Sequence, residues 1–305
     1  MANKVYGIVL ENILKAMEMG IVPWQKPWKG GANQDQNILT KIPYHGVNIL
    51  LLNIISHIYG YKHPYWITWK QAKKKGWSFK SGSKSTLITF FKKYERKKED
   101  EEGNEEQAVK TTKDYYVLRY YRVFNIEYIE DYENIFKKEL EIPVVSNEDR
   151  NLDSKASMLY YYLRSKDIRI KYDQQRSYYS VSDDFINMPQ KTSFVSQDAF
   201  YASLAHEIVH STGISNRLNR FSNAYDNYSH EELVAEIGSA LLCAEMGIKV
   251  DYKNTASYLD GWSKYLSRSK KTEIFSAAKD AEKAVEYIKK SAVEGAIKNS
   301  LKEVA

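Results

Sequence analysis

The sequence has almost no cysteine. Cys243 is the single cysteine among 305 residues, so no internal disulfide can form. It stands in an apolar helical pattern, and we expect it to pack in the core of a protein that works in a reducing cytoplasm. The sequence therefore excludes a disulfide-stapled scaffold.

Long hydrophobic runs are also missing. The longest apolar stretch, residues 46–60, reads GVNILLLNIISHIYG and is interrupted by Asn53 and His57. It is shorter than the roughly 20 apolar residues that a membrane-spanning helix needs. We expect no membrane partner.

The composition is that of an ordinary globular protein. Hydrophobic residues make up 43% of the chain, and the 28% of charged residues carry both signs, which excludes a disordered chain. A length of 305 residues favours two domains. The stretch PVVSNEDRNLDSK at 143–155 reads as the linker, which predicts domains at 1–145 and 150–305.

Hydrophobic periodicity predicts α+β structure in both halves. Two β-rich runs, 85–91 and 114–125, predict paired strands joined by a disordered acidic insertion at about 95–113. In the second half, 168–189 predicts a hairpin, giving a mainly helical domain with a small antiparallel sheet. Helices are expected at about 3–19, 47–58, 68–75, 154–166, 197–212, 230–246, 253–267 and 271–291.

Positive charge is concentrated at the start of the chain. Residues 1–100 contain 17 Lys and Arg against 6 Asp and Glu, whereas residues 101–150 contain 7 against 13. A cationic surface of this kind suits a polyanion such as a nucleic acid. On charge alone, a solvated lysine-rich surface explains the same pattern.

One short motif points to metal chemistry. The segment YASLAHEIVHSTG contains His-Glu-Ile-Val-His, with His206 and His210 one helical turn apart on the same face. Both imidazoles can reach one ion, and Glu207 beside them can accept a proton from a water that the ion activates. The motif is typical of zinc hydrolases.

A catalytic zinc site normally has three protein ligands. The outline of a metzincin would put the third at Asn216, which is a poor ligand, so that class is disfavoured. Downstream, Glu232 and Glu236 share one flank of an apolar helix, and Glu231 lies on the other. We assign Glu232 as the third ligand and Glu236 as the carboxylate that orients a ligand histidine, the gluzincin arrangement, with one zinc ion per chain. The competing interpretation is a solvated acidic flank.

Longer segments resemble a known family. HEIVHSTG, EELVAEIGSALLCAEMG and ASYLDGWSKYL resemble the polyvalent metallopeptidase domain of the ArdC-like antirestriction proteins. GIVPWQKPW, YHGVNILLL, YWITWKQAKKKGWSFKSGSKSTLITFF and YYRVFNIE resemble the N-terminal single-stranded DNA-binding domain of the same family.

The resemblance implies a protein of a mobile genetic element that binds single-stranded DNA and protects incoming DNA from restriction. It also implies a zincin-like fold with His206, His210 and Glu232 as zinc ligands and Glu207 as the catalytic carboxylate. Two functions remain open: a zinc peptidase that acts on a protein such as a host restriction component, and a non-proteolytic shield that coats the strand around a structural zinc domain.

Aromatic and basic residues alternate in the first hundred residues. Rings that stack on unpaired bases and lysines that follow phosphates are the usual features of single-strand binding. Large aromatics are more often buried, so we expect at least half of the tryptophans in these stretches in the core and give the lysines more weight. The candidate contacts are Trp24, Lys26, Trp28, Lys29, Trp66, Trp69, Lys70, Lys73, Lys74, Lys75, Lys80 and Lys84.

Overall fold

The computed structural model describes residues 2–25, 34–94, 115–139, 156–221, 228–250 and 255–303. The acidic insertion expected at 95–113 and the linker expected at 143–155 lie outside the described residues. The division of the chain at 145–150 therefore stays a prediction.

The first half combines helices with a four-stranded sheet. Its elements are α1 (Ala2–Glu18), β1 (Gln36–Asn37), α2 (Val47–Tyr59), β2 (Tyr65–Ile67), α3 (Trp69–Lys74), β3 (Thr86–Tyr94), β4 (Tyr115–Asn125), a 3-10 turn (Ile126–Tyr128) and α4 (Tyr132–Glu139). The strand order is β1-β2-β4-β3, with β1 and β2 parallel and the other pairs antiparallel. The expected pairing of the two β-rich runs is confirmed, because β3 and β4 pair from Thr86 with Val123 to Tyr94 with Tyr115.

The second half is mainly helical. Its elements are α6 (Ser157–Ser165), β5 (Arg169–Lys171), β6 (Tyr178–Ser180), β7 (Phe185–Asn187), a 3-10 turn (Lys191–Ser193), α7 (Gln197–Ser211), α8 (Tyr228–Met246), α9 (Thr255–Arg268) and α10 (Glu273–Glu303). The α+β class predicted from the sequence is confirmed, and α10 continues past the expected end at 291.

The small sheet differs from the prediction. Its order is β5-β7-β6, and although β6 and β7 form the expected antiparallel pair, β5 runs parallel to β7. The reason is the loop after β5. The buried Asn187 side chain donates to the carbonyls of Gln174 and Arg176 at 3.1 and 2.7 Å and accepts from the N–H of Asp173 at 3.1 Å. These bonds hold the loop between β5 and β6 next to β7. The chain therefore crosses from one side of β7 to the other before β6 begins, and β7 then lies between β5 and β6.

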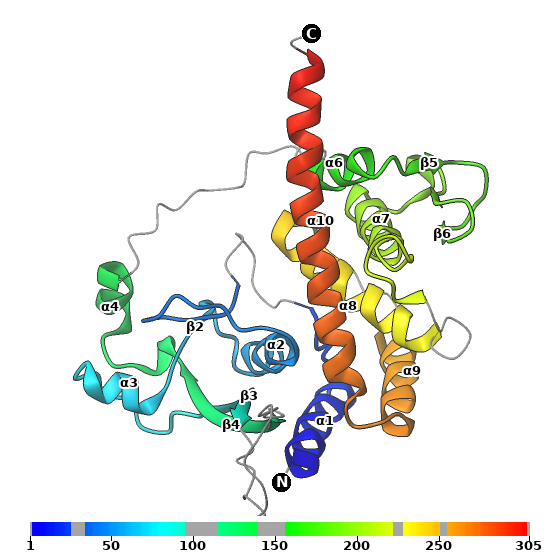
Figure 1. Ribbon diagram of the computed structural model, residues 1–305. Helices are drawn as coiled ribbons and strands as arrows, with labels where there is room; N and C mark the ends of the chain where they lie inside the picture. The colour runs from blue at the N-terminus through cyan, green and yellow to red at the C-terminus, as the bar shows by residue number, and fades with distance from the viewer. Residues whose placement is uncertain are drawn as a thin grey trace, which may run out of the picture.

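The long helix α10 stands between the two halves (Figure 1). It packs mainly against α6 and α8 and also contacts α2, while α7 packs against α8. One hydrophobic cluster joins side chains of α1 and α2 to those of α7, α8 and α10. The halves of the sequence thus share a core, and nowhere along the described chain is a helix long and apolar enough to cross a bilayer.

Helix α1 and the residues after it connect the two halves. α1 packs against α9 of the second half and against α2 and β4 of the first. Trp24 is fully buried, its ring meets those of Tyr258 and Trp262 edge-on, and its Nε1 donates to the Tyr258 hydroxyl at 3.1 Å. The start of the chain is therefore anchored on α9.

A glycine sets the distance between α7 and α8. A Cβ built on Gly238 would lie 2.9 and 3.0 Å from the two γ-carbons of Val209, closer than side-chain atoms normally approach. Val209 directly precedes His210, and Gly238 lies on the helix that carries Glu232. The missing side chain lets α8 approach the face of α7 that bears the histidines.

We expect Gly238→Ala to destabilise the protein by about 1–3 kcal/mol, the usual cost of overpacking a core, despite a gain of up to about 1 kcal/mol in helix propensity. The double variant Val209→Ala with Gly238→Ala removes the clashing methyl groups. Urea unfolding should show that the double variant loses less free energy of unfolding than the two single variants lose together.

Gly261→Ala is the matched control in α9. A Cβ there meets nothing within 4 Å, so the helix-propensity gain should appear as added stability. Equal effects of the alanine at the two glycines would contradict the packing argument.

Candidate metal centre

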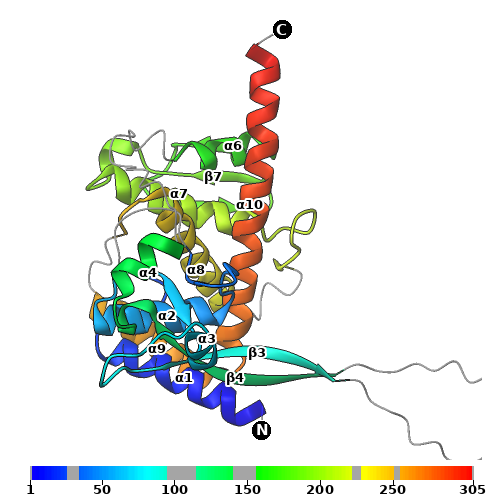
Figure 2. The same ribbon diagram turned by 90° about the vertical axis from the view of Figure 1, so that its left-hand side faces the viewer.

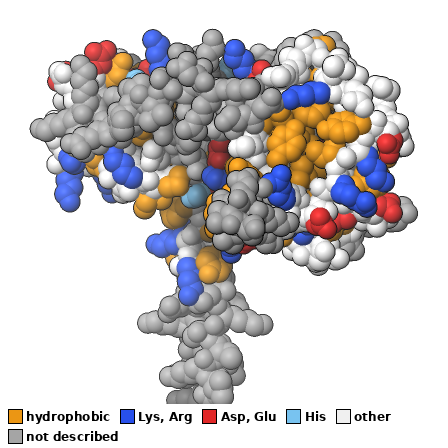
Figure 3. All heavy atoms as spheres, turned by 90° about the horizontal axis from the view of Figure 1, so that it is seen from above, with side chains coloured by type: hydrophobic (Ala, Val, Ile, Leu, Met, Phe, Trp, Pro, Cys, Tyr) orange, Lys and Arg blue, Asp and Glu red, His pale blue; other side chains and the backbone are white. Residues whose placement is uncertain are grey.

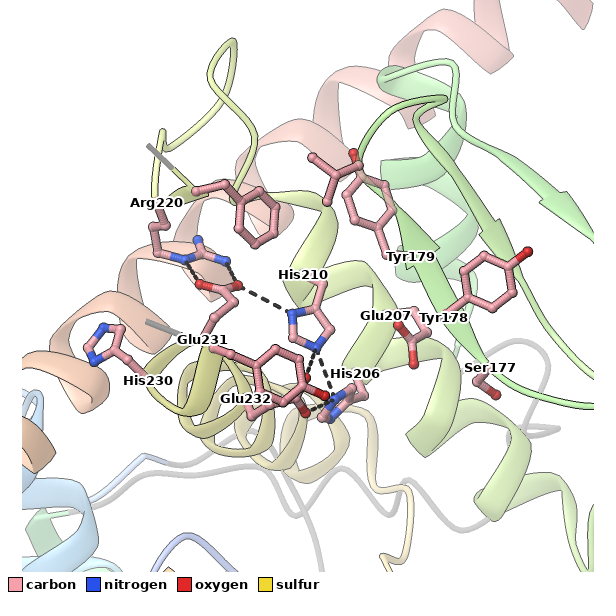
Figure 4. A pocket seen from close by; sticks show the side chains of 13 residues that line it. Ser177, Tyr178, Tyr179, His206, Glu207, His210, Arg220, His230, Glu231 and Glu232 are labelled. Carbon is pink, nitrogen blue, oxygen red and sulfur yellow. Dashed lines mark hydrogen bonds and ion pairs between the residues drawn. The ribbon is translucent and has the colours of Figure 1, made fainter. Parts of the chain in front are cut away.

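Helix α7 places the motif residues at the bottom of a cavity. The helix starts at Ser196, whose side chain accepts a hydrogen bond from the N–H of Ala199 at 3.1 Å. The four-residue spacing puts His206 and His210 on one face. Their Nε2 atoms lie 3.1 Å apart (Figure 4).

Helix α8 brings a carboxylate to the same point. Glu232 Oε2 lies 3.5 Å from His206 Nε2, and Glu232 Oε1 lies 3.6 Å from His210 Nε2. Ligand atoms of a tetrahedral zinc ion are about 3.3 Å apart, given bonds of about 2.0–2.1 Å. The structure therefore brings the three predicted ligands to a spacing that suits one ion, and their assignment as ligands stays a prediction. Within the described part of the chain, no other three His, Cys, Asp or Glu side chains converge in this way.

Glu231 holds the second histidine. Its Oε1 lies 3.4 Å from His210 Nδ1, the ring nitrogen that faces away from His206. Arg220 donates to both oxygens of Glu231, Nε to Oε2 at 2.8 Å and Nη2 to Oε1 at 2.6 Å. Burial raises the pKa of the Glu231 carboxyl, but the hydrogen bonds and charges of Arg220 and His210 together outweigh it and leave that pKa below its usual value. Glu231 thus stays ionised and can orient the imidazole.

Glu236 has a different partner from the one expected. Its Oε2 accepts a hydrogen bond from the Tyr258 hydroxyl at 2.9 Å, and Tyr258 in turn accepts from Trp24. Its effect on His206 is electrostatic: burial lowers the pKa of His206, but the hydrogen bond to Glu232 and the nearby charge of Glu236 raise it above its usual value. Within the described structure, the direct contact of a carboxylate with the outer nitrogen of a ligand histidine is made by Glu231.

Glu207 faces the cavity beside the histidines. The cavity, of about 440 Å³, is also lined by residues of β6 and by Arg220 and Tyr228. Burial raises the pKa of Glu207, and the backbone of Tyr179 on β6 is hydrogen-bonded to its carboxylate. A raised pKa suits a group that takes up and gives back protons near neutral pH.

Two residues of the site carry no sequence signal of their own. Arg220 lies ten positions after His210, in a segment without helical or strand periodicity. Tyr228 begins α8 and lines the cavity, and the charge of Glu232, to which it is hydrogen-bonded, raises the pKa of its phenol. Only the folding of the chain around α7 brings them there.

Both halves of the chain are similar to known proteins. Residues 3–124 match the model of the N-terminal domain of the anti-restriction factor ArdC, and residues 159–280 match that of a zincin-like metallopeptidase. The crystal structure of metal-free antirestriction ArdC protein from the R388 plasmid is 32% identical, with a TM-score of 0.73 over 95% of this chain and 98% of that one. The Mn(II)-bound structure is 30% identical, with a TM-score of 0.69 over 94% and 97%.

This chain belongs to the ArdC family of antirestriction proteins. DNA primase TraC of Escherichia coli is also similar, 32% identical over 92% of this chain, but the chain spans only 26% of that protein. The zincin-like domain and the Mn(II)-bound relative indicate a divalent metal ion.

The ArdC-like fold corrects two of the expected DNA contacts. Trp24 and Trp66 are 0% and 1% exposed, so neither ring can stack on a base. Trp24 packs on α9, and Trp66 donates from Nε1 to Asp35 at 2.6 Å within the first sheet. Both indole N–H groups find an acceptor inside the protein, the buried Asp35 for Trp66 and the partly buried Tyr258 for Trp24, which lets the rings lie in the core.

The other expected contacts divide into two groups. Trp69 is 55% exposed, stacked on Phe79 at 4.9 Å, and its neighbouring lysines reach solvent. Lys26, Trp28 and Lys29 lie outside the described residues. The exposed lysines are Lys70, Lys73, Lys74, Lys75, Lys80 and Lys84.

We expect Glu232→Gln to abolish metal binding and Glu231→Gln to weaken it by about 10–100-fold, the usual cost of losing a carboxylate that orients a ligand histidine. Glu245→Gln is the control, since this α8 carboxylate pairs with Lys289 at 2.9 Å instead. Competition with a chromogenic zinc chelator measures all three. If Glu231→Gln abolishes metal binding and Glu232→Gln retains it, the third ligand is Glu231 and not Glu232.

Proposed function

We propose that this protein is a zinc-dependent peptidase of a mobile genetic element, which binds single-stranded DNA and protects incoming DNA from restriction in the recipient's cytoplasm. One observation carries the proposal: His206, His210 and Glu232 converge on one point, with the buried Glu207 in the same cavity. A structural zinc site has no need of a cavity or of a carboxylate with a raised pKa.

The side chains divide the work. His206, His210 and Glu232 hold the ion, which supplies a Lewis acid that activates water and polarises a carbonyl. Glu207 accepts a proton and returns it to the leaving amine, and its burial brings its pKa closer to neutral pH. Glu231 keeps the His210 ring in place through its contact with Nδ1.

The cavity wall favours an extended peptide as substrate. β6 is an edge strand of its sheet, and Ser177, Tyr178 and Tyr179 line the cavity next to Glu207. An extended chain can pair with such an edge through its backbone, largely independently of side chains. A host restriction component with an exposed loop or terminus is the kind of protein that could bind in this cavity.

The first half of the chain supplies the surface for the proposed DNA partner. The lysines from Lys70 to Lys84 are exposed around Trp69, an arrangement that suits phosphates and an unpaired base. The shield hypothesis uses the same surface without proteolysis, so the two proposals differ only at the metal centre.

The Glu207→Gln variant distinguishes the peptidase hypothesis from the shield hypothesis. The change removes the proton acceptor but no ligand, so the zinc content should stay near one ion per chain while protection is lost. Transfer of an unmodified plasmid into restricting and non-restricting recipients measures protection, with Glu245→Gln as the control. Undiminished protection by a zinc-loaded Glu207→Gln protein would favour the shield and overturn the peptidase.

A further inference from the structure

The two strands β3 and β4 form a ribbon that projects from the body of the protein. They pair over nine residues and extend away from the helices (Figure 2). Neither strand contains an acidic residue, whereas the two carry Lys92, Lys93, Arg119 and Arg122. The described part of the ribbon is therefore purely cationic.

One face of the ribbon also displays large aromatic rings. Paired residues of antiparallel strands lie on the same face, and side chains alternate along each strand. The pairing of Phe91 with Leu118 and of Lys93 with Tyr116 therefore places alternate residues of β4 together. We call this side of the ribbon the aromatic face; its aromatic and charged side chains are Phe91, Lys93, Tyr116, Tyr120, Arg122 and Phe124, and the buried Leu87, Thr89 and Leu118 lie on the same side.

The rings on this face are unusually open to solvent. Tyr116 is 63% exposed, Phe91 57% and Tyr120 49%, while Leu118 between them is buried. Lys93 and Arg122 are exposed on the same face. From above (Figure 3), Lys, Arg and hydrophobic side chains lie together at the base of the projection that points downward in that view. Exposed rings of this size are seldom left without a partner.

The aromatic face leads to the tryptophan expected to bind DNA. At its inner end, the ring of Phe124 lies 4.5 Å from that of Phe79 and 6.2 Å from that of Trp69. Trp69 in turn precedes the exposed lysines of α3. Rings and cations thus extend from α3 out along the ribbon.

We propose that single-stranded DNA lies along the aromatic face, with bases stacked on Phe91, Tyr116 and Tyr120 and phosphates on Lys93 and Arg122. This inference rests on the proposed function. Unpaired bases offer ring faces that phenyl and phenol groups can stack on in any sequence. A ribbon that reads duplex DNA in the major groove needs amides, guanidinium groups and hydroxyls aimed at base edges. Among the described residues of this face, the exposed groups of that kind are Arg122 and the tyrosine hydroxyls, since the Thr89 hydroxyl is buried against Asn48.

Binding of a labelled single-stranded oligonucleotide to the full-length protein tests the proposal. Tyr116→Ala with Tyr120→Ala should weaken binding by at least about tenfold, because each stacked base contributes about 1–3 kcal/mol. Phe90→Ala with Tyr121→Ala is the matched control: it removes two rings of 39% and 38% exposure from the opposite face of the same strands. Equal losses from the two pairs would overturn the assignment of the face.

The salt dependence of binding isolates the cations. Lys93→Gln with Arg122→Gln should reduce the slope of log affinity against log salt by about 1.4, given about 0.7 for each phosphate contact on a single strand. Lys290→Gln, at an exposed lysine of α10, should leave the slope unchanged. An unchanged slope in the double variant would overturn the phosphate contacts.

Photocrosslinking of the wild-type protein avoids any folding defect of the variants. An oligonucleotide carrying 4-thiothymidine should crosslink to the peptide that contains Tyr116 and Tyr120, and unlabelled single strand should compete better than duplex. Crosslinks confined to other peptides, or stronger competition by duplex, would overturn the inference. If the wild-type protein binds no single strand at all, the proposed function fails first.

Discussion

The contact between Gly238 and Val209 is the constraint on which the metal centre depends. Two histidines on α7 can bind an ion only if a third ligand approaches from another element, and that ligand is on α8. Helix axes come closest where a glycine faces a side chain, and Gly238 meets the γ-carbons of Val209. Six residues before Gly238 on α8, this separation leaves Glu232 within 3.6 Å of both imidazoles. With a wider gap between α7 and α8, the Glu232 carboxylate and the two imidazoles would be too far apart to bind one ion.

The centre concentrates negative charge, and the fold compensates for it. Glu207, Glu231, Glu232 and Glu236 surround two histidines, and burial alone would raise the pKa of every one of these carboxyl groups. Arg220 and His210 keep the pKa of Glu231 below its usual value, and the two histidines do the same for Glu232. The pKa of Glu236 stays raised by burial despite the charge of His206 and the hydrogen bond from Tyr258. Glu207 remains the one with a backbone contact and an open cavity, which suits it to proton transfer.

The two halves of the chain meet through the core, although their proposed partners differ. The residues of α1 and Trp24 pack on α9, and Trp24 reaches Glu236 through Tyr258. The proposed DNA-binding surface on β3 and β4 and the candidate metal centre on α7 and α8 thus lie on one structure with a shared core, in which the first helix contacts both halves.

The sequence by itself determined the features that depend on local spacing. The turn between His206 and His210 and the position of Glu232 on an apolar helix follow from a period of 3.6 residues, and the pairing of β3 with β4 follows from β-rich composition. Tertiary structure alone decided which carboxylate orients His210. A helical projection puts Glu236 on the flank of Glu232 and so favours it, but Arg220, from a segment without periodicity, holds Glu231 against His210 instead. It also decided which tryptophans are buried, since an indole with a buried acceptor and one without look identical in the sequence. Trp66 donates to Asp35 and Trp24 donates to Tyr258, and both rings lie in the core. Trp69 lies at the surface.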